Sequence, residues 1–326
     1  MDNVSGALTS LYRRCGYGRF RMSKFEEYGL YSEHRAFLPS AGMITFTDTD
    51  GRLMALKPDV TLSIVRGSRD GVRSKYCYNE SVFRTVNGRF TEVEQAGLEY
   101  IGDPDPVCLS EVLLLAYLSL RRISNTCVLD VSDLRILTAA AKRADVSDFG
   151  LFVKRIGQKN LSGALQLCRN GCAEKLVGGL LGAPSEPAEA EKLLYSLSDG
   201  EEWDGTVGSF FRVVRAVDGC RFDISVVNDP DYYSGLVMQG YVEGVPAAVL
   251  SGGEYGNLMK KMGKNNSAAG FAVYLDRLGG KSEPAFEPDR TVFYGKDDDP
   301  SAVIGSIRRA LEEGGSVMSV PVKEDD

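Results

Sequence analysis

Two long strand-like segments joined by an Asn-Gly pair are the feature that most constrains the fold of this chain. The first reads CYNESVFRTVNG over residues 77–88, and the second reads RFTEVEQAGLEYIG over residues 89–102. Asn-Gly is a strong signal for the tight turn of a β-hairpin, whose flanking strands run antiparallel. The sequence therefore predicts an antiparallel sheet that contains this hairpin.

Further strands are expected on both sides of the hairpin. Residues 41–66 predict a strand, a DTDG turn, a second strand and then a helix opened by Pro58 and Asp59. Strand-like patterns return in three later segments, at residues 221–227, 232–242 and 247–253. Two sheet-forming parts of the chain thus enclose a middle part of different character.

The middle part is rich in helix-forming residues. A largely buried helix is expected at about residues 106–124, with Asp105 or Ser110 as its cap. A helical insertion is then expected at about residues 134–217. Two more helices are expected after the later strands, at residues 255–262 and in AAGFAVYLDRL at residues 268–278.

Two domains are expected from the position of a linker that contains Pro284 and Pro288. Residues 1–280 would form an α+β core that includes the helical insertion. Residues 281–326 carry the segments TVFYG, PSAVIGSIRRALEEGG and SVMSVPV, a strand, helix and strand pattern. We therefore expect a small C-terminal β-α-β module.

Composition excludes several classes of site. The formal net charge of -7 argues against simple electrostatic binding of a long nucleic-acid backbone. The one histidine, His34, has no triad or zinc-motif setting and is interpreted as a partly exposed residue. The seven cysteines contain no CxxC pair, so neither a disulfide framework nor a metal site is predicted.

The sequence also contains no cofactor motif and no membrane span. It has neither a Walker A sequence nor a GxGxxG that follows a strand and opens a helix. Its longest apolar stretch, VLLLAYLSL from Val112, is about half the length that a bilayer requires. The N-terminus has no targeting pattern, so the reducing cytoplasm is the expected location.

Several polar residues lie within otherwise strand-like, half-buried segments. Gln95 and Glu99 are four residues apart, which places them on one face of a strand, and Gly97 between them leaves space. Carboxylates, an amide, a guanidinium and phenols together would suit a small zwitterion. The alternative is a set of separate surface polar residues. The group comprises Asp59, Thr61, Arg84, Gln95, Glu99, Asp231, Tyr232 and Tyr233.

Five segments in one order resemble the catalytic core of class II histidyl-tRNA synthetases, between about Leu11 and Leu278. LKPDVTLSIVR and DPDYYSG resemble the histidine-binding segments of that family. VFRTVNGRFTEVEQAGLEYIG is similar to its motif 2, and SGGEYGNL and GFAVYLDRL are similar to its GGRYD and motif 3 regions. The resemblance implies an α+β fold with a six-stranded antiparallel sheet flanked by helices.

The resemblance also implies a set of site residues. A histidine-binding pocket would be formed by Asp59, Thr61, Arg84, Gln95, Glu99, Tyr232, Tyr233 and Tyr255. Arg84 and Arg277 would correspond to the arginines of motifs 2 and 3.

This chain departs from the synthetase pattern at positions that serve catalysis. Asn228 stands where the synthetases carry an arginine that stabilises charge during adenylate formation, a loss expected to reduce the rate by orders of magnitude. Glu254 replaces the arginine of GGRYD, and its charge is expected to repel a triphosphate. Val86 and Thr91 replace charged residues of motif 2. Only about 46 residues follow Gly280, too few for a complete anticodon-binding domain.

A synthetase-like core that keeps its amino-acid pocket but loses catalysis resembles the regulatory subunits of ATP phosphoribosyltransferase. That resemblance implies a non-catalytic chain that dimerises and assembles with short-form catalytic subunits into a hetero-octamer. It implies that the chain activates the first step of histidine biosynthesis and conveys feedback inhibition by histidine. No catalytic residue is then expected here.

Two other classes remain open from the sequence. One is a minimal histidyl-tRNA synthetase, or an amino-acid-activating paralogue that forms an adenylate, because Arg84 and Arg277 are retained. The other is a binding module that senses histidine or uncharged tRNA, although the net acidity of the chain argues against tRNA.

Overall fold

The structure, a computed structural model, describes residues 4–32, 42–86, 88–278, 288–295 and 298–322. His34 and Asn87 therefore lie outside the described residues. The chain divides into two compact units, one of Asp2–Gly279 and one that includes Gly280–Asp326. The candidate site residues all belong to the first unit.

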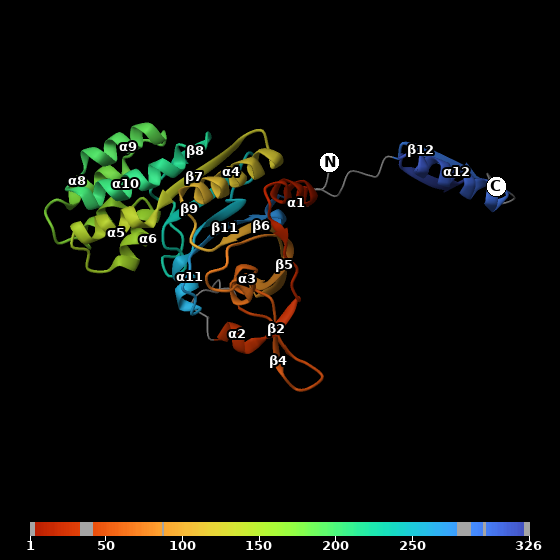
Figure 1. Ribbon diagram of the computed structural model, residues 1–326, viewed down its shortest axis with the longest axis horizontal. Helices are drawn as coiled ribbons and strands as arrows, with labels where there is room; N and C mark the ends of the chain where they lie inside the picture. The colour runs from red at the N-terminus through yellow and green to blue at the C-terminus, as the bar shows by residue number, and fades with distance from the viewer. Residues whose placement is uncertain (1–3, 33–41, 87, 279–287, 296–297, 323–326) are drawn as a thin grey trace. The chain divides into compact units, whose positions relative to one another are not determined.

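An eight-stranded sheet forms the centre of the larger unit (Figure 1). Its strand order is β1-β5-β6-β11-β10-β9-β7-β8. The inner pairs from β5 to β7 are all antiparallel, whereas the short edge strands pair in parallel, β1 with β5 and β8 with β7. The expected fold class is confirmed, with two parallel edge strands added to the six antiparallel ones. The strands are β1 (Gly18–Arg19), β5 (Ser74–Val86), β6 (Arg89–Ile101), β7 (Cys127–Asp133), β8 (Cys220–Phe222), β9 (Leu236–Val242), β10 (Leu250–Glu254) and β11 (Ala268–Tyr274).

The predicted hairpin is the longest pairing in this sheet. Strands β5 and β6 pair from Val86↔Arg89 at the turn to Ser74↔Ile101 at the far end. Gly88 has φ +76°, a left-handed conformation that glycine adopts without steric strain. The turn residue therefore agrees with the register of the hairpin.

The prediction of a helix at residues 268–278 is wrong. Residues Ala268–Tyr274 form β11, a central strand between β6 and β10, and Leu275–Leu278 form a short 3₁₀ helix. Phe271 and Val273 are buried in the core on one face, so the apolar residues follow a period of two. Pairing on both sides outweighs the helical propensity of the alanines in this segment.

Three other expectations need correction. The helix α3 (Thr61–Gly67) begins three residues after Pro58, and the Asp59 side chain accepts the Leu62 N–H at 2.9 Å. Of the strand expected at residues 221–227, only Arg221 and Phe222 lie in the sheet, in the strand Cys220–Phe222. Strand β7 was not expected, because it is a short apolar run directly between two helices.

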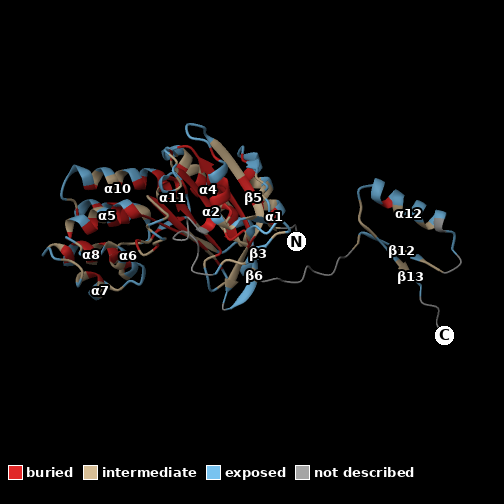
Figure 2. Cartoon of the chain, turned by 90° about the horizontal axis from the view of Figure 1, so that it is seen from below, coloured by how far each residue is buried: buried red, intermediate tan, exposed pale blue. Residues whose placement is uncertain are grey.

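Helices cover both faces of the sheet, and each face has its own apolar core (Figure 2). Helices α1 (Val4–Arg14) and α4 (Pro106–Ile123) contact one face, with Leu98 and Phe271 beneath them. Asp105 caps α4 by accepting the Cys108 N–H at 2.9 Å. Helices α3 and α11 (Gly256–Lys261) contribute to the core on the other face.

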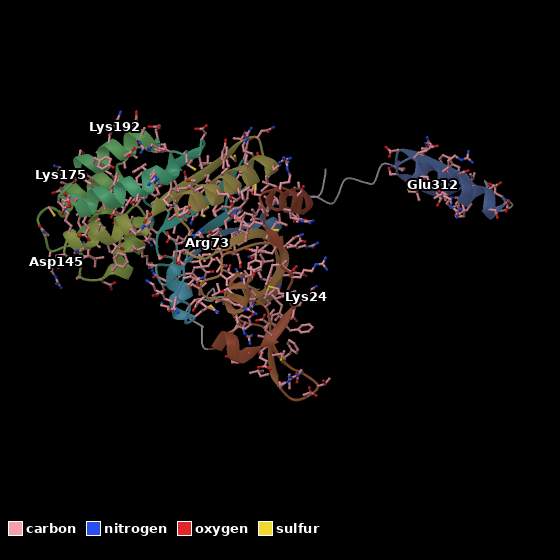
Figure 3. The ribbon with its side chains drawn as sticks, in the orientation of Figure 1. Lys24, Arg73, Asp145, Lys175, Lys192 and Glu312 are labelled. Atoms are coloured by element: carbon pink, nitrogen blue, oxygen red, sulfur yellow. The ribbon has the colours of Figure 1, made fainter. Side chains whose placement is uncertain are left out.

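Six helices occupy the part of the chain between β7 and β8. Trp203 is buried among them and donates its indole N–H to the Leu194 carbonyl at 2.7 Å. Charged side chains such as Lys175 and Lys192 lie on the outer side of this group (Figure 3). The helices are α5 (Leu134–Arg143), α6 (Phe149–Gly157), α7 (Leu161–Leu165), α8 (Ala173–Leu181), α9 (Pro187–Ser196) and α10 (Glu201–Val214).

Two smaller sheets complete the described elements. The first pairs β4 (Leu53–Leu56) with β2 (Phe25–Glu27) and β3 (Thr45–Thr47), and α2 (Tyr28–Ser32) contacts it. The second lies in the C-terminal unit, where β12 (Arg290–Tyr294) and β13 (Val317–Pro321) pair in parallel and contact α12 (Pro300–Glu312). None of the described helices is both long enough and apolar enough to span a bilayer.

The packing of the central strands beneath α1 and α4 can be tested by substitution of a buried leucine. Leu98 is fully buried in β6, whereas Leu53 in the small sheet is half exposed. We expect Leu98→Ala to lower the free energy of unfolding by about 2 to 5 kcal/mol, because it leaves a cavity in a close-packed core. The matched Leu53→Ala is expected to cost less than about 1 kcal/mol. Urea unfolding of both variants measures the difference, and equal losses would contradict this packing.

Candidate functional site

All eight residues of the expected pocket line one cavity of about 150 Å³ on the α3 and α11 side of the sheet. A space of this size accommodates a single aromatic ring. Asp59 and Thr61 come from the start of α3, and Arg84, Gln95 and Glu99 come from the hairpin. Tyr232, Tyr233 and Tyr255 come from the segments on either side of β9 and β10. Segments that are far apart in the sequence therefore meet at one place.

Glu99 is the most deeply buried acid of the cavity, with 2% of its surface exposed. Its carboxylate accepts one hydrogen bond from the Thr61 hydroxyl and one from the Tyr255 hydroxyl, each at 2.7 Å. Burial raises the pKa of Glu99 to about 8, although the two hydroxyl donors oppose the rise. A pKa of about 8 leaves this carboxyl mostly protonated at neutral pH.

A second acid and a guanidinium also line the cavity. Burial raises the pKa of Asp59, and the nearby charge of Arg84 opposes that rise. Arg84 donates from Nε to the Pro58 carbonyl at 3.0 Å, which ties the hairpin to the segment before α3. Its two terminal nitrogens have no acceptor among the described residues. The cavity therefore offers both a positive and a negative group to a ligand.

The remaining polar groups surround these charges. Gln95 is 4% exposed, and its amide has no hydrogen-bond partner among the residues that the structure describes. The ring of Tyr232 lies 4.7 Å from that of Tyr233 and 5.9 Å from that of Tyr255, between ring centroids. The site thus combines an aromatic wall with an amide that is available to a ligand.

Glycines at the floor of the cavity make room for these side chains. Gly270 pairs with Glu99 across β6 and β11, and a Cβ at Gly270 would lie 1.9 Å from the Glu99 carboxylate. A Cβ at Gly97 would lie 2.5 Å from the Tyr78 hydroxyl, which agrees with the space expected between Gln95 and Glu99. Close approach of backbone and side chain therefore requires glycine at both positions.

Sequence reasoning missed several lining residues. Tyr78 is buried in β5 and was interpreted only as part of a strand. Ser251, Gly252, Gly270, Phe271, Ala272 and Tyr274 line the cavity from β10 and β11. Tyr274 pairs with Gln95 across the sheet. It was not predicted as a lining residue because residues 268–278 were expected to form a helix. The period of two in that segment was the available signal.

Some residues singled out from the sequence lie outside the cavity lining, among them Asp231, Arg277 and Glu254. Asp231 is exposed and forms an ion pair with Lys261 at 2.8 Å. Arg277 lies over the ring of Tyr274, 4.1 Å from its centroid. Glu254 forms a long ion pair with Arg135 at 3.8 Å rather than facing the cavity. The same guanidinium binds Asp133 at 2.6 Å, so the pair leaves the expected repulsion of a triphosphate by Glu254 untested.

Asn228 is held against the cavity wall. Its side-chain N–H donates to the carbonyl of Gly252, a lining residue, at 3.0 Å. Its amide oxygen accepts from Gln239 at 3.2 Å, and the Gln239 oxygen accepts from the Tyr241 hydroxyl at 2.8 Å. The position that carries an arginine in the synthetases is thus occupied by a neutral side chain with structural partners.

The family model for histidyl-tRNA synthetase matches residues 1–278 of the chain. The chain belongs to the histidyl-tRNA synthetase family. A relative from Caldanaerobacter subterraneus subsp. tengcongensis, named ATP phosphoribosyltransferase regulatory subunit, is 26% identical over 295 residues. The match covers 85% of this chain and 77% of that relative. The family includes both synthetases and chains that bear the regulatory name.

Two solved structures share the fold of this family member. One, described as an ATP phosphoribosyltransferase regulatory subunit/histidyl-tRNA synthetase from Bacillus halodurans C, has a TM-score of 0.82 and 21% identity. It covers 98% of this chain and 88% of that chain. The other is the ATP phosphoribosyl transferase (HisG:HisZ) complex from Thermotoga maritima, with a TM-score of 0.62 and 18% identity over 83% of this chain and 96% of that chain.

The raised pKa of Glu99 predicts a pH dependence of stability. Because the folded state holds this proton more tightly than the unfolded state, whose value is 4.5, Glu99 weakens the fold as the pH rises from about 4.5 to about 8. We expect Glu99→Gln to make the free energy of unfolding fall less steeply over that interval. Urea unfolding at several pH values measures the slope. An unchanged slope would show that Glu99 titrates normally.

The contact between Gly270 and Glu99 predicts a second effect. A Cβ at Gly270 would also lie 2.3 Å from the Leu98 carbonyl, a backbone atom that has little freedom to move. We expect Gly270→Ala to lower the free energy of unfolding by about 1 to 3 kcal/mol, as overpacking does. Gly205 in α10 is the control, because a Cβ there meets no atom within 4 Å. Thermal unfolding should show no loss for Gly205→Ala, and equal effects would contradict the close contact.

Proposed function

We propose that this chain is the non-catalytic regulatory subunit of ATP phosphoribosyltransferase, and that its cavity binds histidine as a feedback effector. It serves the first step of histidine biosynthesis by activating a short-form catalytic subunit. The relative from Caldanaerobacter bears that name, and the Thermotoga complex is described as a HisG:HisZ assembly. These names support the regulatory role. The residues that line the cavity support histidine as the effector.

One observation carries the proposal. The cavity contains groups that suit an amino acid, but the neutral Asn228 stands where the synthetases have a catalytic arginine. The ammonium of a zwitterionic amino acid meets Asp59, its carboxylate meets Arg84, and an imidazole nitrogen meets the buried carboxyl of Glu99. Adenylate formation needs a positive group for the charge that develops in the transition state. Asn228 supplies none, whereas binding alone requires only ground-state contacts.

The assembly follows from the same assignment. We propose a cytoplasmic dimer of this chain that joins catalytic subunits in a hetero-octamer. Histidine must then bind the inhibited assembly more tightly than the active one, because an effector shifts an equilibrium only by its difference in affinity. The affinity of histidine for both forms of the assembly, measured by calorimetry, checks this requirement.

The decisive measurement is phosphoribosyl-ATP formation by the short catalytic subunit from the same source, with and without this chain. We expect activation by the chain and reversal of that activation by histidine. Absence of both activation and complex formation would contradict the proposal. Histidine-dependent exchange of pyrophosphate with ATP by this chain alone would instead favour an adenylate-forming paralogue.

A pocket variant tests whether the cavity is the effector site. Gln95→Ala removes an amide that is available to the ligand, so we expect a loss of about 1 to 3 kcal/mol in the binding free energy of histidine. Activation of the catalytic subunit should persist, since Gln95 lies inside the cavity. Gln166→Ala is the matched control, because Gln166 is exposed outside the cavity. Equal histidine affinity in both variants would show that histidine acts elsewhere.

A further inference from the structure

Tyr274, the last residue of β11, forms part of the cavity wall. Its backbone N–H donates to the Val249 carbonyl at 2.8 Å, which holds this end of β11 against the segment that enters β10. Tyr274 also pairs with Gln95 on β6, and residues directly opposite each other in a sheet point to the same face. Strand pairing on both sides therefore fixes the side chain of Tyr274 at the cavity.

Arg277 packs on the ring of Tyr274 without lining the cavity. The centre of its guanidinium lies 4.1 Å from the ring centroid, as in a cation–π contact. A terminal nitrogen of Arg277 donates to the Ala248 carbonyl. Arg277 is exposed and is not among the residues that line the cavity. The ring of Tyr274 therefore stands between this guanidinium and the cavity.

A second guanidinium, that of Arg84, lies near the same ring. Burial raises the pKa of Tyr274, and the charges of Arg84 and Arg277 both oppose that rise. Arg84 lines the cavity, and its terminal nitrogens have no acceptor among the described residues. Without the ring, two guanidiniums from different segments would border one continuous space.

The number of available guanidiniums decides which anions the cavity can hold. A free amino acid has one carboxylate, which Arg84 alone can bind. A nucleoside triphosphate carries several negative charges and also needs more space. The cavity measures about 150 Å³, whereas pockets for larger small molecules span about 300 to 1,000 Å³. The cavity as it stands therefore fits the amino acid and not the nucleotide.

We propose that Tyr274 excludes nucleoside triphosphates from the cavity, because its ring fills the space beside Arg84 and keeps Arg277 outside. One side chain thus separates the two arginines whose retention left an adenylate-forming paralogue open from the sequence. The inference rests on the proposed function for its purpose, since an effector site in an assembly that consumes ATP must not respond to ATP.

ATP is the probe that tests this exclusion, with binding to the full chain measured by calorimetry in the absence of histidine, so that no adenylate can form. We expect no saturable binding by the unaltered chain. Tyr274→Ala removes the ring and should bind ATP at least about tenfold more tightly, as a new charge-assisted contact allows. The double variant Tyr274→Ala/Arg277→Gln should lose that gain, because the uncovered guanidinium is its source.

Two further substitutions at the same position control for the ring and for folding. Tyr274→Phe keeps the ring and loses only the hydroxyl, so it should not bind ATP. Tyr274→Val also removes the ring but suits a strand better than alanine does, so it should gain ATP binding with the fold intact. Absence of any gain in the folded ring-free variants, or equal ATP binding by the unaltered chain, would overturn the proposal.

Glu254 offers the competing explanation, because its negative charge was expected to repel a triphosphate. Glu254→Gln removes that charge and leaves Tyr274 in place, so ATP should still not bind. ATP binding by Glu254→Gln would assign the exclusion to charge rather than to the ring, and would overturn the proposal. Activation of the catalytic subunit by the unaltered chain, measured in parallel, keeps a failure of this proposal distinct from a failure of the regulatory function.

Discussion

The burial of the Glu99 carboxylate is the constraint on which the site depends. An acid in this position requires donors, which Thr61 and Tyr255 supply from two other segments of the chain. It also requires space, which Gly270 provides on the neighbouring strand. The start of α3, the hairpin and the segment after β10 are thus brought together around one carboxylate, and its raised pKa follows from the same burial.

The neutral side chain at Asn228 changes what this arrangement can do. The cavity keeps acids, an amide, a guanidinium and an aromatic wall, which are groups that suit a zwitterion in its ground state. A positive group placed for a transition state is the part that binding does not need. The hydrogen bonds of Asn228 to Gly252 and Gln239 give the position a structural role in the cavity wall.

The hairpin has a different environment on each of its faces. Side chains of alternate residues point to opposite sides of a strand, so Tyr78 and Asn79 have different surroundings although they are neighbours. On one side lies the cavity with Glu99 and Asp59, and on the other lies α1. The sheet is shared, so a small shift in its register would alter both.

The sequence by itself determined the hairpin and the order of the segments, and it named eight of the residues that line the cavity. Asn-Gly sets a turn by local backbone preference, and the spacing of Gln95 and Glu99 places both on one face of a strand. Only the tertiary structure decided the state of residues 268–278, because Ala269, Gly270 and Ala272 carry little intrinsic preference until two strands pair with them. It also decided that Glu254 faces Arg135, that Tyr274 joins the cavity and that Arg277 lies over its ring, since such contacts depend on packing rather than on local pattern.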